Sequence, residues 1–187
     1  MKILYQGSPG AYSHLAAQEL YPDAEIVACK TFDECFLKAS KESNSKIIIP
    51  ESNRITGNIG IEYLIFKHRL NVHAEHFHRI EHNLLALPGA KLKDIKNVFS
   101  HAQALSQCSE FIKKNNMSEN VRADTAGSAE LISKNQNKND AAIASKLSAK
   151  IYKLEIIAPN IENEKGNVTR FLIMGKNILQ PEFGKGK

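Results

Sequence analysis

Short segments with strand character alternate along this chain with segments of helical spacing, and this alternation limits the possible folds more than any other feature. Strand patterns fall at residues 3–5, 25–28, 47–49, 71–87, 98–99, 121–123, 141–145 and 169–174. Helical patterns lie between them, at residues 11–20, 32–39, 57–66, 103–114, 125–133 and 146–150. This order of elements is typical of α/β proteins with mainly parallel sheets. A length of 187 residues suffices for one well-buried domain or two small lobes.

Composition and charge exclude several classes of protein. The net charge is +5, but the lysines are scattered and aromatic residues make up only 7%, so we expect no nucleic-acid partner. A mild positive bias suits an anionic small molecule equally well. No apolar run approaches the length of a membrane span, so we expect no membrane partner. The N-terminal residues are read as a first strand, because their apolar part is too short for a signal peptide.

Cysteine and histidine usage predicts a reducing compartment and no metal site. The chain has three cysteines, an odd number without metal-ligand spacing, which favours a cytoplasmic location. Histidines gather at residues 73, 76, 78 and 82. No carboxylate cluster completes a ligand set around them, so we expect neither a metal nor another cofactor.

Four unusually polar loops stand where predicted strands lead into helices. They span residues 6–14, 50–57, 100–108 and 124–129. In α/β sheets, ligands bind beyond the carboxyl ends of the strands, and free backbone N–H groups at helix starts attract anions. We expect the four loops to converge on a substrate that carries carboxylates.

The segment Asn167–Phe171 places polar side chains at the start of a short apolar strand. In extended backbone the side chains alternate, so Asn167, Thr169 and Phe171 share one face while Arg170 takes the other. The structural alternative is a buried strand whose arginine forms an ion pair.

Structural roles also compete for several other polar residues. The Gly7–Gly10 segment alone reads as a turn, and Asp124 reads as a helix cap. Histidines placed like His14 and His101 more often have a structural role than a catalytic one. Cys108 is predicted to be a small buried apolar residue.

Taken together, these loops resemble the catalytic domain of prephenate dehydratases over nearly the whole chain. The family motifs G-x-x-G-x-Y-S, S-H-x-x-A-L-x-Q-C, D-T-A-x-x-A, A-A-I-A-S and N-x-T-R-F are similar to residues 7–13, 100–108, 124–129, 141–145 and 167–171. The resemblance implies two α/β lobes like those of a type II periplasmic binding protein, with the active site in the interlobe cleft. Lobe one is expected at about residues 1–77 plus 165–187, and lobe two at about 78–164.

The resemblance also implies an activity, the decarboxylating dehydration of prephenate to phenylpyruvate in L-phenylalanine biosynthesis, without a cofactor. Thr169 is then the expected catalytic donor to the departing hydroxyl. Expected substrate-binding residues are Asn53, Ser100, Gln107, the backbone of Thr125 and Ala126, the apolar wall Phe171, and Arg170. For Arg170, carboxylate binding and structural pairing remain equal alternatives.

Two features depart from the family pattern. The family loop P-x-E-N-[ST]-x-x-G aligns with residues 50–57, but Ser52 holds the glutamate position and Arg54 the hydroxyl position. Glu51 stands one residue earlier, and a one-residue slip in a strand turns a side chain to the other face. The second departure is that only residues 180–187 follow the last strand, so no phenylalanine-sensing ACT domain is expected on these residues.

Three functions remain open at this point. The chain is expected to act as a prephenate dehydratase, as an arogenate dehydratase, or as a catalytically weak bilobal binding protein. A homodimer is the expected assembly.

Overall fold

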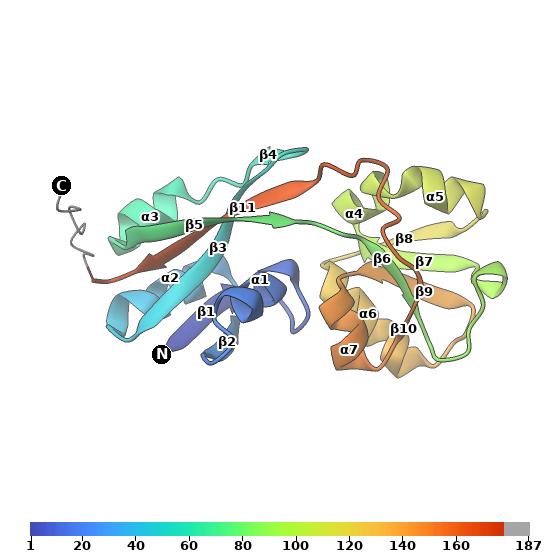
Figure 1. The fold of residues 1–187 in the computed structure, drawn as a ribbon, viewed down its shortest axis with the longest axis horizontal. Helices are drawn as coiled ribbons and strands as arrows, with labels where there is room; N and C mark the ends of the chain where they lie inside the picture. Colours follow the sequence, from blue (N-terminus) through green and yellow to red (C-terminus); the bar gives the residue numbers. More distant parts are fainter. Residues whose placement is uncertain (178–187) are drawn as a thin grey trace, which may run out of the picture.

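The computed structural model describes residues 1–177, so the C-terminal segment 180–187 lies outside the described residues. Two α/β bodies lie side by side, each built around its own sheet (Figure 1). We call the body that holds strands β1–β5 and β11 lobe one, and the body that holds β6–β10 lobe two. The two-lobed α/β architecture expected from the resemblance is confirmed.

The sheet of lobe one has the order β2-β1-β3-β11-β5, and β4 pairs with β3 outside this path. Its strands are β1 (Lys2–Gln6), β2 (Glu25–Cys29), β3 (Ser45–Asn53), β4 (Gly57–Asn58), β5 (Asn71–Arg79) and β11 (Val168–Gly175). The first three run parallel to one another, whereas β11 runs antiparallel to both β3 and β5.

The sheet of lobe two has the order β10-β6-β9-β7-β8. Its strands are β6 (Asn83–Ala86), β7 (Asn97–His101), β8 (Ser118–Arg122), β9 (Asp140–Ala144) and β10 (Glu155–Ala158). Strand β7 runs parallel to β8 and β9, but β6 and β10 run antiparallel to their neighbours. Both sheets are therefore mixed, which corrects the expectation of mainly parallel sheets.

Helices cover the sheets and supply the buried apolar contacts. They are α1 (Tyr12–Leu20), α2 (Phe32–Lys41), α3 (Glu62–His68), α4 (Ala102–Gln107), α5 (Ser109–Lys114), α6 (Thr125–Asn135) and α7 (Lys146–Tyr152), with a 3₁₀ turn at Leu92–Asp94. Each lobe has its own core; Ile47 and Phe36 belong to the core of lobe one, and Val98 and Ile143 to that of lobe two. Among residues 1–177, no helix has the length and apolarity needed to cross a membrane.

Several predicted elements differ in detail from those observed. The predicted strand 71–87 is two strands in different sheets, because the chain leaves lobe one after Arg79 and enters lobe two at Asn83. The predicted helix 103–114 is broken at Cys108, whose backbone is not helical. Strand β10 was not predicted.

The chain passes between the lobes twice, and the two crossings run together. After β5, residues 80–82 lead into lobe two, and residues 159–167 return to β11. The amide of Ile80 donates to the carbonyl of Asn167 at 2.9 Å, and Ile161 donates to His82 at 2.9 Å. Figure 1 shows β5 running toward lobe two and β11 returning from it. Any residue on these crossings is thus held near both lobes.

Direct contacts also join the first loop of lobe one to helix α7 of lobe two. The hydroxyls of Ser145 and Ser148 both donate to the carbonyl of Gly10, at 2.6 and 2.9 Å. The Tyr152 hydroxyl donates to the carbonyl of Pro9 at 2.8 Å. Because both serines are fully buried, these bonds fix the position of the loop against lobe two.

Candidate active site

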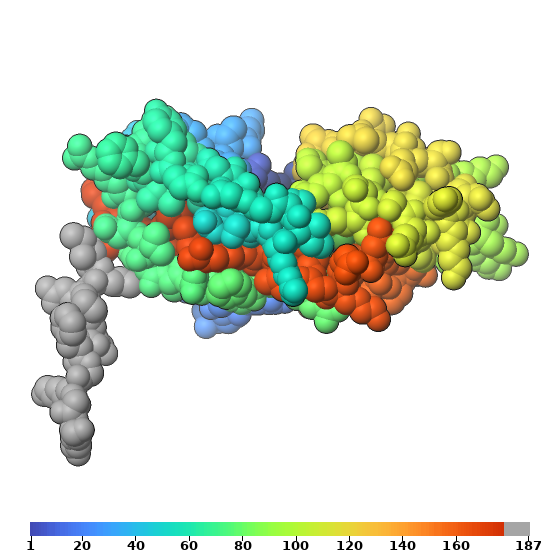
Figure 2. Space-filling model, turned by 90° about the horizontal axis from the view of Figure 1, so that it is seen from above, coloured from blue at the N-terminus to red at the C-terminus, as the bar shows by residue number. Residues whose placement is uncertain are grey.

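A cleft of about 470 Å³ lies between the lobes. Figure 2 shows it from above as a notch between two masses. The return crossing and strand β11, coloured orange to red, run below the notch in this view. Residues from all four predicted loops line it, and its volume is in the range of small-molecule sites. The lining contains Gln6, Gly7, Ala11, Tyr12, Ser13, Lys30, Pro50, Asn53, Thr56, Ile59, Ile80, His82, His101, Gln103, Ala104, Gln107, Ala123, Asp124, Thr125, Asn167, Thr169 and Phe171.

Strand β11 presents Thr169 to this cleft. Alternation along the strand brings Asn167, Thr169 and Phe171 to the cleft, as the sequence predicted, and all three are buried. The Nδ2 group of Asn53, directly opposite on β3, donates to the Thr169 Oγ1 at 2.9 Å. Since the hydroxyl oxygen accepts this bond and has no acceptor of its own among residues 1–177, its O–H is left to donate to a ligand.

Asn53 uses all of its own hydrogen-bonding groups within the protein. Its Nδ2 also donates to Oδ1 of Asn167 at 2.7 Å. Its Oδ1 accepts from the backbone N–H groups of Ile55 at 2.9 Å and Thr56 at 3.2 Å. The side chain therefore holds Thr169 in place and has no group left for a substrate, which corrects its expected place among the substrate-binding residues.

A chain of hydrogen bonds continues from Asn167 into lobe two. Asn167 Nδ2 donates to Oε1 of Gln107 at 3.1 Å, and Nε2 of His82 lies 2.8 Å from the same oxygen. The Nδ1 of His82 lies 2.8 Å from the hydroxyl of Tyr12, whose oxygen is also 3.0 Å from the carbonyl of Glu81. Polar groups from both lobes and both crossings thus form one network.

Burial sets the protonation of this network. Desolvation lowers the pKa of His82, against opposing effects of its bond to Gln107 and of Glu162. Desolvation is also the main cause that raises the pKa of Tyr12 well above its usual value. Both side chains are therefore neutral near pH 7.

The start of helix α6 offers backbone donors to the cleft. Asp124 caps the helix as predicted, because its Oδ1 accepts from Gly127 N at 2.6 Å. The N–H groups of Thr125 and Ala126, at the first two helical positions, have no partner inside the helix. Thr125 lines the cleft, whereas the Ala126 side chain is fully buried. Lys30 also lines the cleft, and its cation and these donors both suit an anionic group.

An apolar wall stands beside Thr169. Phe171 is 1% exposed and lies opposite Pro50 in the sheet, and both line the cleft together with Ile59 and Ile80. Such a surface accommodates a hydrocarbon ring and excludes water from its neighbours. The predicted position of Phe171 agrees with the structure.

The structure does not bring Ser100 to the cleft. Its side chain is fully buried and its hydroxyl donates to the carbonyl of Ile143 at 2.7 Å. The side chain joins β7 to β9 inside lobe two, so its expected contact with substrate is wrong. The neighbouring His101 does line the cleft, where its Nδ1 caps helix α4 by accepting from Gln103 N at 3.3 Å.

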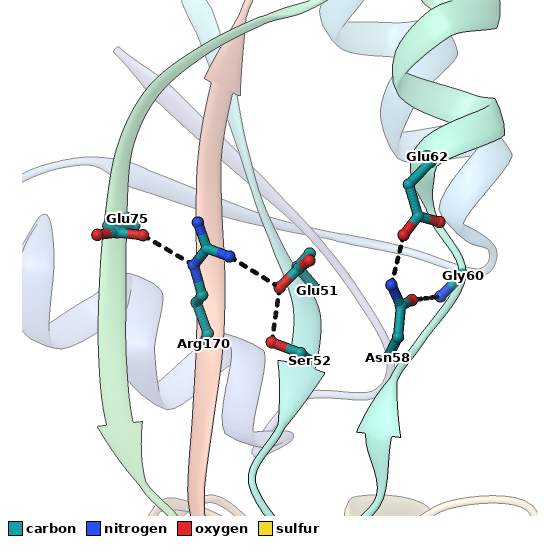
Figure 3. A network of polar contacts seen from close by, with 7 residues as sticks. All are labelled: Glu51, Ser52, Asn58, Gly60, Glu62, Glu75 and Arg170. Carbon is teal, nitrogen blue, oxygen red and sulfur yellow. Dashed lines mark hydrogen bonds and ion pairs between the residues drawn. The ribbon is translucent and has the colours of Figure 1, made fainter.

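Arg170 also lies outside the cleft lining. Its Nε donates to Glu75 at 2.7 Å, and its Nη1 lies 3.4 Å from Glu51 (Figure 3). These contacts bridge β11 to its two neighbouring strands. Of the two alternatives for this arginine, the structure shows the ion pair, and its expected place among the substrate-binding residues is wrong.

A β-bulge accounts for the unusual order of Glu51 and Ser52. The register of β3 against β11 shifts at this point, because Arg170 pairs with Ser52 and Phe171 with Pro50. Glu51 is the extra residue and reaches the same face as Ser52, whose hydroxyl donates to it at 2.6 Å (Figure 3). The expectation that the slip turns Glu51 to the other face is wrong, since the bulge compensates for it.

Three residues of this network carry no role predicted from the sequence. His82 and Tyr12 were not identified as site residues, and Asn167 was placed on the right face without a role. His82 was considered only as a possible metal ligand. Its place inside the predicted strand 71–87, where the resemblance puts the passage from lobe one to lobe two, is the signal that could identify it.

Comparison with known proteins agrees with the arrangement of this cleft. Residues 3–178 match the family model of prephenate dehydratase. The chain is 38% identical over 186 residues to arogenate dehydratase 2 of Petunia hybrida, an alignment that covers 99% of this chain and 47% of the relative. The chain thus spans about half the length of the curated relatives it matches.

Two solved structures share the fold. One, described as GqqA, a novel type of quorum quenching acylase, has a TM-score of 0.90 and 32% identity over 96% of this chain and 66% of its own. The other is prephenate dehydratase from Staphylococcus aureus, with a TM-score of 0.83 and 26% identity over 96% of this chain and 67% of its own. The matched family model covers almost the whole chain, and on this ground the chain belongs to the prephenate dehydratase family.

Proposed function

We propose that the chain catalyses the decarboxylating dehydration of prephenate to phenylpyruvate. The observation that carries this proposal is the Thr169 hydroxyl, which Asn53 holds at 2.9 Å with its O–H left to donate into the cleft. A fixed donor is the group needed where a ring hydroxyl departs as hydroxide, because it stabilises charge that develops only in the transition state.

The reaction needs little further chemistry from the protein. The electron pair of the bond to the ring carboxylate moves into the ring as carbon dioxide leaves, and the bond from the ring to the hydroxyl breaks. The hydroxide takes up one proton and leaves as water, and the ring becomes aromatic. Thr169 supplies a hydrogen bond to the leaving oxygen, since its own high pKa keeps it from being the net proton source.

The rest of the cleft matches the two carboxylates and the ring of this substrate. The start of α6, with Thr125 and Ala126, supports binding of the carboxylate that the product retains, and Lys30 adds positive charge. The apolar wall around Phe171 lies beside Thr169 and suits the ring. Poor solvation of the ring carboxylate there favours its loss as a neutral molecule.

Arogenate is the alternative substrate, since it differs from prephenate by an amine in place of the keto group. The match to a petunia protein named arogenate dehydratase favours testing it. Purified protein is incubated with each substrate in parallel; phenylpyruvate is measured by ultraviolet absorbance and phenylalanine by amino-acid analysis. Turnover of prephenate supports the proposal, and turnover of arogenate alone reassigns the substrate. If neither substrate is turned over, the remaining alternative is the catalytically weak binding protein.

An acylase activity has less support from the cleft, although one structural neighbour is so described. Acyl transfer by a hydroxyl nucleophile requires a base within hydrogen-bond reach. Among residues 1–177, the Thr169 hydroxyl is bonded to an amide group, and no serine or threonine of the cleft lining is bonded to a histidine ring. An N-acylated amine added to the same assay is expected to remain uncleaved.

We also propose a homodimer in a reducing compartment such as the cytoplasm. The cysteines at 29, 35 and 108 are free and buried, which suits a reducing setting. Strand β5 is an edge strand whose Val72 and Phe77 are 52% and 60% exposed, a surface suited to pairing with a second copy. Sedimentation of the purified chain at several concentrations measures its state, and a monomer at all of them would contradict the dimer.

A further inference from the structure

We propose that His82 is a positioning residue, whose Nε2–H fixes the carboxamide of Gln107 with its NH₂ group toward the cleft. The inference rests on the proposed function only for the identity of the substrate. The orientation of Gln107 does not depend on the substrate. It follows from the direction of each hydrogen bond in the series from Asn53 through Asn167 and Gln107 to His82, and the backbone amides that bond Asn53 set that direction.

The direction begins at two backbone amides that can only donate. The N–H groups of Ile55 and Thr56 point at one end of the Asn53 carboxamide, so this end is its oxygen. The other end is therefore NH₂, and it donates to Thr169 and to Asn167. The end of Asn167 that receives this bond is then its oxygen.

The donor and acceptor ends of Asn167 and Gln107 are fixed in the same way, as far as the imidazole ring of His82. The remaining end of Asn167 is NH₂, and it lies 3.1 Å from Gln107, so the contacted atom of Gln107 is Oε1. Nε2 of His82 lies 2.8 Å from this oxygen and must carry a hydrogen to bond it. Every bond of the series then has one donor and one acceptor. Exchanging the oxygen and the NH₂ group of any single amide would set two donors or two acceptors against each other.

Two consequences follow for Gln107. Its oxygen accepts from both Asn167 and His82, which uses both lone pairs. Its Nε2 group has no partner among residues 1–177, and the side chain lines the cleft. The amide thus presents two N–H donors to a substrate oxygen, as a carboxylate or a keto group requires.

His82 is well placed for this role. It is 3% exposed, lies on the first crossing, and its backbone N–H donates to Oε2 of Glu162 on the return crossing at 3.0 Å. Without the ring, only the bond from Asn167 holds the orientation of the Gln107 amide, so the amide turns its oxygen toward the substrate more readily.

The Tyr12 hydroxyl completes the ring's contacts in either protonation state. With neutral His82 the hydroxyl donates to Nδ1, and with an imidazolium it accepts from Nδ1 and donates to the carbonyl of Glu81. The other titratable groups that act on this pair are the side chains of Glu81, Glu162 and Cys108. Protonation of His82 therefore leaves the bond to Gln107 in place.

The first test reads the tautomer and needs no substrate. The ¹⁵N shifts of the His82 ring in the intact chain, near neutral pH, are expected to show a protonated Nε2 and a bare Nδ1. A Nδ1–H tautomer would overturn the proposal, because Nε2 could not then donate to Gln107. This result stands whether or not the protein turns over prephenate or arogenate.

The second test is a double-mutant cycle on the substrate that wild type turns over. His82→Leu is expected to raise KM about tenfold, the usual size of one hydrogen bond to a charged group. In a Gln107→Ala background the same change is expected to alter KM less than about twofold, because its effect passes through the amide. Equal effects in both backgrounds would overturn the proposal.

A conservative variant separates positioning from folding. His82→Gln keeps a donor within reach of Gln107 and is expected to restore most of the loss in KM. If His82→Leu unfolds, as judged by its thermal transition, the tautomer measured in the wild-type chain decides the positioning role. Failure of wild type on both substrates would refute the proposed function and leave the tautomer result to decide the positioning role.

Discussion

At the scale of single residues, the direction of hydrogen bonds determines which groups are left for a ligand. Asn53 and Thr169 lie 2.9 Å apart, and the amide donates to the hydroxyl. Asn53 is therefore a support, and Thr169 is the donor. Residue type alone suggests that both side chains bind substrate; the count of used donors and acceptors separates their roles.

Replacement of Thr169 tests this assignment. Thr169→Ala is expected to lower kcat by about 100-fold or more, because a donor to a leaving group acts mainly in the transition state. KM and the unfolding transition are expected to change little. Thr169→Ser is the matched control, since it keeps the hydroxyl and is expected to retain most of the activity. Steady-state kinetics measures both variants, and near-normal kcat in folded Thr169→Ala would refute the role.

Replacement of Arg170, in contrast, is expected to leave substrate binding unchanged. Its ion pairs with Glu51 and Glu75 are partly exposed, so Arg170→Gln is expected to lower the free energy of unfolding by less than about 1 kcal/mol. KM is expected to stay unchanged because the side chain is outside the cleft lining. Urea unfolding and steady-state kinetics measure the two quantities. A tenfold rise in KM would show that the arginine binds substrate after all.

At the scale of elements, the sequence predicts what depends on local periodicity. The two faces of β11 follow from alternation, and Asp124 follows from the preference of helix caps. The break at Cys108 carries no glycine or proline, and the bulge at Glu51 depends on pairing with β11, more than 100 residues away. Ser100 has the right residue type at the right loop, but its partner, the Ile143 carbonyl, comes from a distant strand.

The loop that precedes α1 approaches lobe two most closely at Gly10. Gly10 has φ of +94°, and an added Cβ would lie 2.5 Å from Ser148 Oγ and 2.9 Å from Ser148 Cα. Gly10→Ala therefore combines backbone strain with a clash against lobe two, and we expect it to reduce both the melting temperature and kcat/KM.

Gly57→Ala is the matched control for this change. Gly57 has φ of +82°, but nothing lies within 4 Å of its added Cβ, so the variant carries the strain alone. Strain of this kind costs about 1–2 kcal/mol. Thermal melts are expected to place Gly10→Ala clearly below Gly57→Ala. Equal melting temperatures would mean that the contact between loop and α7 does not hold the lobes.

At the scale of the whole molecule, two bodies with separate cores are joined by two crossings and by contacts that the first loop and helix α1 make with lobe two. The hydrogen-bond series from Asn53 to Tyr12 runs through the point where the crossings meet. The site is therefore assembled by the same chain segments that connect the lobes. Distortion of either crossing is expected to affect binding before it affects the core of a lobe.

Stability is expected to fall on mild acidification because of three histidines, the buried His78 and His82 and the half-buried His14. Desolvation lowers the pKa of His14, His78 and His82, although Glu19 opposes the effect at His78. A histidine whose pKa is lower in the folded state takes up its proton more readily when unfolded, with a pKa of about 6.5. Its contribution is complete above that value and is lost as pH falls toward the folded pKa.

Urea unfolding at about pH 7.5 and about pH 5.5 measures this loss. The carboxylates with lowered pKa values, Asp33, Glu34 and Glu62, titrate below this window, and Tyr5 and Tyr152, with pKa values raised to about 12, titrate above it. The free energy of unfolding is therefore expected to be lower at the acidic pH. His78→Gln removes one of the three groups without touching the cleft lining and is expected to make the fall smaller. Equal stability at the two pH values would show that the three histidines are as readily protonated in the folded chain as in the unfolded one.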